Sequence, residues 1–260
     1  MPSWEPGPND RRAIVGDVHG LPQLLRDILG LIGAIDAAGE RVPGWWLCQI
    51  GDLIHGGHNV RTDGECLAEG LRYFDALLLG NHELPHAYPE AEFPRFGGQT
   101  PLSLNAAGML SQAIAEGRFR AAVAVDGWLV THAGLHPKLV RHETLPVDTV
   151  ALAEALNERF SQRVMSSRPV LPFDGIGRER GGVDPVGGIF WLDWQVLSHA
   201  TGTEALPQIV GHTPRPERPE SVGDHLWCID LGAGRRHRIA ALVKDGPDAP
   251  WRVVVFPDDA

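Results

Sequence analysis

Short apolar runs recur along the chain, and several of them end abruptly in a turn that contains glycine. Runs of this kind, bounded by turn residues, are typical of buried β-strands. They predict five strands, at residues 12–15, 45–50, 76–79, 128–131 and 208–210. Elsewhere apolar residues recur at helical spacing. This spacing predicts three helices, at residues 21–35, 103–116 and 149–164.

The alternation of strands and helices favours an α/β fold. The last third adds three predicted strands with no helix between them, at residues 226–230, 239–243 and 251–256. We expect these strands to form a second, more antiparallel sheet packed on the first. The chain is therefore predicted to be one domain over residues 1–260, with a central β-sandwich of two mixed sheets flanked by helices. Residues 165–188 are rich in Gly, Pro and Arg, which predicts a long loop or lid.

The composition excludes several classes of protein. The 260 residues are 43% hydrophobic and 22% charged, with a net charge of −10, and this acidic balance disfavours sequence-independent nucleic-acid binding. No apolar run is long enough to span a membrane. The start lacks the apolar core of a secretory signal, and three cysteines are too few for a disulfide framework. We therefore expect a cytoplasmic protein with reduced cysteines, no membrane association and no stable nucleic-acid binding.

Polar side chains of a particular kind stand where the predicted strands end. They are Asp17, His19, Asp52, Asn81, His82, His132 and His212. Because ligands bind outside the carboxyl ends of strands in open α/β sheets, we expect these side chains to meet in one crevice. Mixed oxygen and nitrogen ligands suit Mn, Fe or Zn better than Ca, with Mn our first expectation. A carboxylate can bridge two cations, and we assign that position to Asp52.

Five segments of the chain together resemble the calcineurin-like metallophosphoesterases, and most closely their phosphoprotein-phosphatase branch with its dinucleotide-tetraphosphatase relatives. GDVHG, GDLIHGG and GNHE resemble that family's GDxHG, GDxVDRG and GNHE, and THAGLHP and VGHTP resemble its two later histidine segments. The likeness covers residues 14–214, in the order in which the family has these segments. It implies the metallophosphoesterase fold and a binuclear metal centre.

The resemblance also implies a role for each residue. One cation would be held by Asp17, His19 and Asp52. The other would be held by Asp52, Asn81, His132 and His212. A hydroxide bridging the two cations would attack phosphorus in line, Asn81 would also contact the phosphate, and His82 would protonate the leaving group or hold the phosphate. Pro214 stands where many relatives have a further histidine, as expected for the phosphoprotein-phosphatase branch.

One segment departs from the family pattern. His55 and Gly56 stand where the family has an Asp that orients the catalytic histidine and an Arg that grips phosphate. Another group must therefore orient His82, and another arginine must bind the phosphate. Because the planar guanidinium donates two parallel hydrogen bonds to phosphate, our candidates are Arg178 and Arg180, and less strongly Arg61.

We therefore predict a two-metal phosphoesterase that hydrolyses phosphomonoesters, with phosphoserine and phosphothreonine of proteins as candidate substrates. One alternative has the same chemistry and is a bis(5'-nucleosyl)-tetraphosphatase-like hydrolase. Another alternative is of a different class, a metal-binding scaffold protein without catalysis. The partner in the two enzymatic cases is a phosphoprotein, a nucleotide or a small phosphoester. A nuclease is a weaker option because the acidic chain has no basic stripe.

Overall fold

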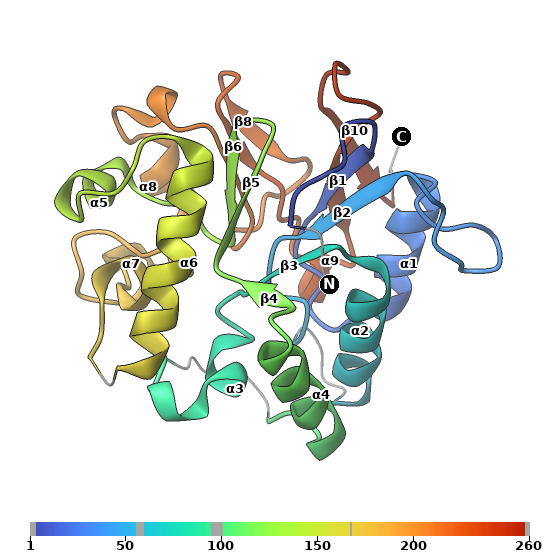
Figure 1. Ribbon diagram of the computed structural model, residues 1–260, viewed down its shortest axis with the longest axis horizontal. Helices are drawn as coiled ribbons and strands as arrows, with labels where there is room; N and C mark the ends of the chain where they lie inside the picture. The colour runs from blue at the N-terminus through green and yellow to red at the C-terminus, as the bar shows by residue number, and fades with distance from the viewer. Residues whose placement is uncertain (1–3, 56–59, 95–100, 167, 258–260) are drawn as a thin grey trace.

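Two β-sheets form the centre of the molecule (Figure 1). The structure is a computed structural model, and it describes residues 4–55, 60–94, 101–166 and 168–257. The first sheet contains β1 (Arg11–Val15), β2 (Trp45–Gln49), β3 (Ala76–Leu78), β4 (Phe119–Arg120), β10 (Ile239–Lys244) and β11 (Arg252–Phe256). Their order is β11-β10-β1-β2-β3-β4. β1 to β4 run parallel, whereas β10 and β11 are antiparallel to their neighbours.

The second sheet is also mixed. Its strands are β5 (Ala122–Val125), β6 (Trp128–Thr131), β7 (Gln208–Val210), β8 (Glu220–Val222) and β9 (Leu226–Cys228), in the order β5-β6-β7-β9-β8. β6, β7 and β9 are parallel, and β5 and β8 are antiparallel edge strands. Ile14 and Trp46 of the first sheet share one buried apolar cluster with Val130 and Ile209 of the second. This shared core confirms the predicted sandwich of two mixed sheets.

Helices flank the sandwich on both sides (Figure 1). On the side of the first sheet lie α1 (Pro22–Leu31), α2 (Val60–Tyr73) and α4 (Leu104–Ala115). On the side of the second lie α5 (Pro137–His142), α6 (Thr149–Met165), α7 (Leu171–Asp174) and α8 (Trp194–Ser198). Shorter pieces are α3 (Leu84–Ala87), α9 (Ala233–Arg236), η1 (Pro89–Ala91), η2 (Arg178–Arg180) and η3 (Thr203–Ala205). α1 illustrates the packing, because it starts at a proline and buries Leu25 and Ile28 on one face.

The five strands and three helices predicted from the apolar patterns are confirmed as β1, β2, β3, β6, β7, α1, α4 and α6. The pattern did not predict α2, because Gly64 and Gly70 weaken its helical signal. Gly70 allows α2 to pack closely against a neighbouring loop. A side chain at this position would collide with Leu53, in the loop that follows β2.

The expectation of a separate C-terminal sheet without helices is wrong. β9 joins the second sheet, β10 and β11 join the first beside β1, and the short helix α9 lies between β9 and β10. All six residues of β10 are buried, which fits a strand in the interior of a sheet covered on both faces. The C-terminal strands are therefore shared between the two sheets and do not form a sheet of their own.

Residues 165–188 are anchored to the rest of the molecule at several points. Arg163 donates two hydrogen bonds of 2.6 Å to the carboxylate of Asp174, and Phe173 is fully buried. The main-chain amide of Ile176 donates to Asp184 at 2.9 Å. The single domain over residues 1–260 and the lid at residues 165–188 stay predictions.

In the described part of the chain, every helix is too short or too polar to cross a membrane.

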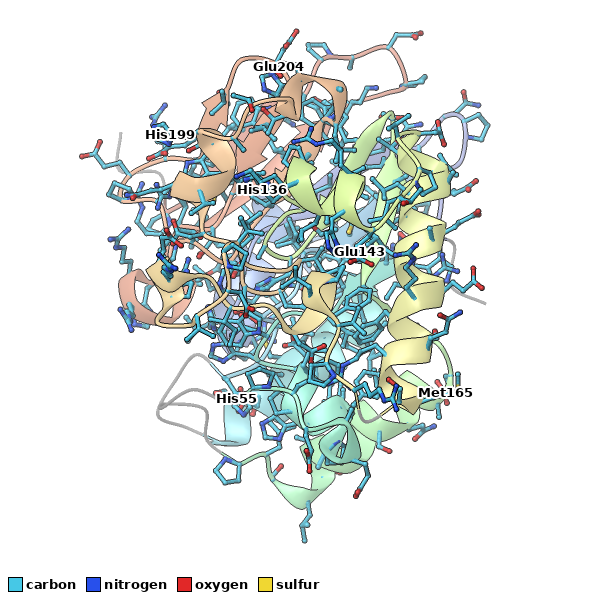
Figure 2. All side chains as sticks on the ribbon, turned by 90° about the vertical axis from the view of Figure 1, so that its left-hand side faces the viewer. His55, His136, Glu143, Met165, His199 and Glu204 are labelled. Atoms are coloured by element: carbon cyan, nitrogen blue, oxygen red, sulfur yellow. The ribbon has the colours of Figure 1, made fainter. Side chains whose placement is uncertain are left out.

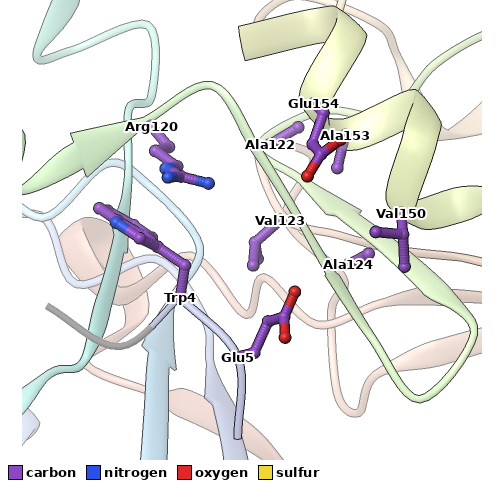
Figure 3. Close-up of a pocket in the computed structure, with 9 residues that line it drawn as sticks. All are labelled: Trp4, Glu5, Arg120, Ala122, Val123, Ala124, Val150, Ala153 and Glu154. Carbon is purple, nitrogen blue, oxygen red and sulfur yellow. The ribbon is translucent and has the colours of Figure 1, made fainter.

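The chain crosses from the first sheet to the second between β4 and β5, and the N-terminal residues cover this crossing. The guanidinium carbon of Arg120 lies 4.3 Å from the ring centroid of Trp4, a cation–π contact. Trp4 and Arg120 line a small pocket together with Val123 and Glu154 (Figure 3).

Candidate metal centre

The polar residues predicted to meet at the strand ends do lie together. Asp17 follows β1, Asp52 follows β2 and Asn81 follows β3, which are parallel neighbours. His132 directly follows β6 and His212 lies two residues beyond β7, in the facing sheet. Because parallel strands end at the same edge, the two sheets bring both rows of side chains to one place.

Asp52 stands at the centre of this cluster. Its Oδ2 lies 3.8 Å from Nε2 of His19, 3.9 Å from Nε2 of His82 and 3.4 Å from Nε2 of His132. Nε2 of His132 is in turn 3.2 Å from Nδ1 of His212 and 3.0 Å from Oδ1 of Asn81.

Two groups of donor atoms within this cluster are close enough to hold a cation. One consists of His19, Asp52 and His82, and the other of Asp52, His132 and His212. Asp52 belongs to both groups, as a bridging carboxylate would. The first group differs from the expected one because His82 completes it in place of Asp17.

Asp17 is tied to the opposite sheet. Its carboxylate accepts hydrogen bonds from the main-chain amide of His212, at 3.1 Å and 3.3 Å, and its Oδ2 lies 4.0 Å from Nε2 of His19. It therefore lies beside the donor groups and links the loops that carry His19 and His212.

The loops that present these residues require unusual backbone. His19, Asp52 and His212 have φ of 54°, 53° and 67°, in the left-handed region that non-glycine residues rarely adopt. Gly80 and Gly211 leave room for the carboxylates, since a Cβ at either position would overlap Asp52 or Asp17.

Glu83 holds two of these loops in register, a role that sequence reasoning missed. Its carboxylate is fully buried. It accepts hydrogen bonds from the main-chain amides of Asp52 (2.9 Å), Ile54 (3.1 Å) and Gly80 (2.8 Å). Burial, and next the charge of Asp52, raise the pKa of Glu83 to about 7.

Asp230 is a further buried carboxylate that the sequence analysis did not single out. It lies two residues beyond β9, is 1% exposed, and its Oδ1 accepts a hydrogen bond of 2.6 Å from the amide of Gly232. The signal was available in the sequence, because Asp230 follows an apolar strand and precedes a glycine turn. Asp17 and Asp52 also follow apolar strands, but there the glycine directly precedes the acid.

The electrostatics of the cluster suit cations. Burial lowers the pKa of His19, His82 and His212, which favours the neutral imidazole that can bind a metal. Burial alone would raise the pKa of Asp52, but the surrounding histidines, His132 foremost, bring it well below its usual value. Burial raises the pKa of Asp17, and the charges of Asp230 and Asp52 raise it further.

Several buried polar atoms in and beside this cluster lack a partner. Within the described residues, Nδ1 of His82, Nε2 of His212 and Oδ2 of Asp230 are buried and have no hydrogen-bond partner. Buried polar atoms are nearly always satisfied, because leaving one unpaired costs about 1–3 kcal/mol. A site of carboxylate and imidazole donors with such atoms fits divalent transition-metal ions.

The two arginines proposed to bind phosphate lie in different settings. Arg180 donates from Nη2 to Oγ1 of Thr213 at 2.5 Å, and its Nε is 3.0 Å from the carboxylate of Asp193. Its charge acts on His212, and after burial it is the strongest influence that lowers the pKa of this histidine. Arg178 is exposed at the first residue of η2. The structure therefore places Arg180, of the two, beside the cluster.

His55 is buried and lies next to His82, with ring centroids 5.7 Å apart. Its own amide donates a hydrogen bond of 2.7 Å to Asp63. Gly56 and the side chain of Arg61 lie outside the described residues. His136 and His199, labelled with His55 in Figure 2, lie in another part of the molecule.

A family model described as calcineurin-like phosphoesterase matches residues 11–216, which contain all seven residues predicted to form the site. The chain belongs to the calcineurin-like phosphoesterase family. This family consists of metal-dependent hydrolases with a binuclear metal centre. The resemblance drawn from the five sequence segments is thereby confirmed, as is the expectation of an enzyme. Among proteins with curated descriptions, none matches this sequence significantly.

Solved structures share the fold of this calcineurin-like phosphoesterase at low identity. A cold-active protein-tyrosine phosphatase of a psychrophilic Shewanella species is 16% identical, with a TM-score of 0.63 over 96% of this chain and 83% of that one. A candidate diadenosine tetraphosphatase is 18% identical, with a TM-score of 0.55 over 96% and 95%. A protein serine/threonine phosphatase from Saccharomyces cerevisiae is 15% identical, with a TM-score of 0.52 over 96% and 80%. These likenesses show the fold.

Proposed function

We propose that this protein hydrolyses phosphomonoesters with the help of two divalent cations, of which Mn²⁺ is the first candidate. The position of Asp52 supports this proposal most strongly. Its carboxylate lies within 4 Å of three histidines and belongs to both donor groups. When bound, a pair of cations at such a carboxylate would clamp a phosphate and lower the pKa of a water molecule.

Each residue of the cluster then has a proposed role. Asp52 would hold both cations, with His19 and Asp17 on one side. On the other side lie Asn81, His132 and His212. Asn81 also contacts the phosphate through its amide. His19 and His212 would each bind through a neutral nitrogen, in keeping with the lowered pKa of both.

His82 is proposed to act on the substrate itself. Its side chain is 21% exposed, whereas that of His132 is fully buried. Its Nε2 faces the carboxylate of Asp52 at 3.9 Å, and its main-chain amide donates to Asp52 at 3.0 Å. A histidine that is both accessible and held beside the bridging carboxylate can protonate a leaving alkoxide or hold a phosphate oxygen.

Arg180 is proposed as the phosphate clamp, with Arg178, two residues earlier in the same turn, as a second contact. Thr213 and Asp193 hold the guanidinium of Arg180 on the side of His212. Its planar fork is suited to two phosphate oxygens at once.

The test is hydrolysis of p-nitrophenyl phosphate in the presence of Mn²⁺. We expect Asp52→Asn and His82→Asn to lower kcat by about 10²-fold to 10⁴-fold, as expected when a general acid or a metal-bridging carboxylate is lost. The matched control is His199→Asn. His199 is exposed and directly follows α8, and this variant should keep wild-type activity. Wild-type turnover in Asp52→Asn or His82→Asn would refute the role given to that residue.

Product analysis separates the substrate classes. A phosphopeptide and diadenosine tetraphosphate are offered to the Mn²⁺-loaded enzyme at equal concentration. Release of inorganic phosphate from the peptide supports the monoesterase proposal. Cleavage of the dinucleotide alone would replace it with a dinucleotide polyphosphatase.

A further inference from the structure

We propose that Asp230 is an additional carboxylate of the metal centre and helps to hold the cation on the side of Asp17 and His19. This inference rests on the proposed function, because it assigns a residue to the same centre. It starts from an unpaired atom. Asp230 is 1% exposed, and within the described residues its Oδ2 is buried without a hydrogen-bond partner.

The main chain brings Asp230 beside Asp17. The residues just before them, Ile229 and Gly16, are in close contact, since a Cβ on Gly16 would come within 2.7 Å of the carbonyl oxygen of Ile229. The amide of Ile229 donates to Val210 at 2.8 Å, which fixes this chain against the strand that leads to the other histidine loop. Asp230 and Asp17 therefore approach the cluster from facing sheets.

The electrostatic neighbours of Asp230 locate it on one side of the centre. Of the charged groups that act on Asp17, Asp230 has the largest effect, ahead of Asp52. Of those that act on Asp230, His19 has the largest effect. Asp230 therefore lies close to Asp17 and His19.

That side of the centre is also the one with fewer donors. Asn81, His132 and His212 gather on the other side of Asp52, with 3.0 Å and 3.2 Å between their donor atoms. Asp17 is partly engaged by the amide of His212. The free Oδ2 of Asp230 supplies a further negative oxygen for the cation there, directly or through a water molecule bound to it.

The other two oxygens of Asp230, Oδ1 and the main-chain carbonyl oxygen, accept hydrogen bonds from main-chain amides. Oδ1 accepts from the amide of Gly232 at 2.6 Å, and its carbonyl oxygen accepts from the amide of Arg215 at 2.8 Å. Asn in place of Asp keeps an oxygen for the Gly232 amide and removes the charge. Asp230→Asn is therefore a variant that separates the charge of Oδ2 from the shape of the turn.

The experiment measures Mn²⁺ binding to the metal-free protein by calorimetry, together with the Tm with and without Mn²⁺ and no substrate present. We expect Asp230→Asn to weaken one of two Mn²⁺ sites by about 10-fold to 100-fold, the effect typical of losing a supporting carboxylate. The rise in Tm on adding Mn²⁺ should shrink, and the Tm of the metal-free protein should not fall, because a like charge beside Asp17 has been removed.

Asp126→Asn is the matched control. Its carboxylate is bound by Lys244 at 2.9 Å and lies 3.4 Å from Arg12, in the turn at the far end of β6 from His132. We expect this variant to lower the Tm and to leave both Mn²⁺ affinities unchanged. If Asp230→Asn does not fold without metal, Asp230→Ser takes its place, because its hydroxyl can still accept from Gly232.

Two results would overturn the inference about Asp230. One is Mn²⁺ affinities within twofold of wild type in the folded variant. The other is a lower metal-free Tm with the full Mn²⁺-induced rise retained, which would make Asp230 a purely structural residue. Either result, with a wild type that binds Mn²⁺ and hydrolyses p-nitrophenyl phosphate, leaves the proposed function standing. A wild type that binds no Mn²⁺ contradicts both proposals.

Discussion

Replacing Glu83 by Gln should change how the free energy of unfolding of the metal-free protein depends on pH. The carboxyl of Glu83 is fully buried against three main-chain amides, and its pKa is raised from 4.5 to about 7 by burial and by Asp52. A carboxyl with a raised pKa in the folded state favours the unfolded state once it ionises. Glu83 therefore destabilises the metal-free protein increasingly as the pH rises from about 4.5 to about 7, and by a constant amount above that.

The magnitude follows from the two pKa values. Between pH 5 and pH 8, ionisation of Glu83 lowers the free energy of unfolding by about 2 to 3 kcal/mol, at 1.36 kcal/mol for each pKa unit. Gln cannot ionise, so Glu83→Gln removes this contribution. The variant also loses one acceptor oxygen for the three amides, which costs about 1–3 kcal/mol at every pH. The difference in stability between variant and wild type should therefore move by about 2 to 3 kcal/mol in favour of the variant from pH 5 to pH 8.

The assay is urea unfolding of metal-free protein in EDTA at several pH values, followed by circular dichroism. Glu158→Gln, an exposed glutamate on α6, is the control and should track wild type within about 0.5 kcal/mol at all pH values. A stability difference between Glu83→Gln and wild type that stays constant from pH 5 to pH 8 would refute the reasoning. It would mean that Glu83 titrates at its ordinary pKa.

Two further predictions concern activity and packing. Arg180→Ala should raise KM for p-nitrophenyl phosphate by about 10-fold or more, since a charge-assisted hydrogen bond contributes about 1.5–3 kcal/mol, while Arg178→Ala has a smaller effect; an unchanged KM in Arg180→Ala would show that the clamp is elsewhere. Gly211→Ala should weaken Mn²⁺ binding in calorimetry by about 10-fold or more, because its Cβ overlaps the carboxylate of Asp17. Gly30→Ala, in a helix with open space around it, should bind Mn²⁺ normally and be about 0.5–1 kcal/mol more stable. Equal Mn²⁺ binding by both glycine variants would contradict this account of Gly211.

The parts of the fold that were predictable are those with a local cause. A buried strand that ends in a glycine turn is recognisable from a few consecutive residues, so β1, β2 and β3 and the polar site residues that follow them could be predicted. The sheet in which β10 pairs was not predictable in the same way. Its apolar run is compatible with either sheet, and its place beside β1 follows from burial on both faces.

The residues of the candidate site also divide into those with a local sequence signal and those without one. The side chains that gather at the centre, such as Asp52 and His132, were identified because each stands at a strand end. Glu83 was missed as a positioning residue because two of its three main-chain partners, the amides of Asp52 and Ile54, lie about thirty residues away and leave no sequence signal. Arg178 and Arg180 are two residues apart, and only the turn of η2 decides that Arg180 contacts Thr213.

The central claim is that Asp52 lies between two cations. The most direct measurement is electron paramagnetic resonance of the protein loaded with Mn²⁺, together with the metal content per chain. The account predicts two Mn²⁺ ions per chain with an exchange-coupled spectrum, as expected for ions about 3.5–4 Å apart, and loss of the coupling in Asp52→Asn. One Mn²⁺ ion per chain, or two ions with uncoupled spectra, would contradict it.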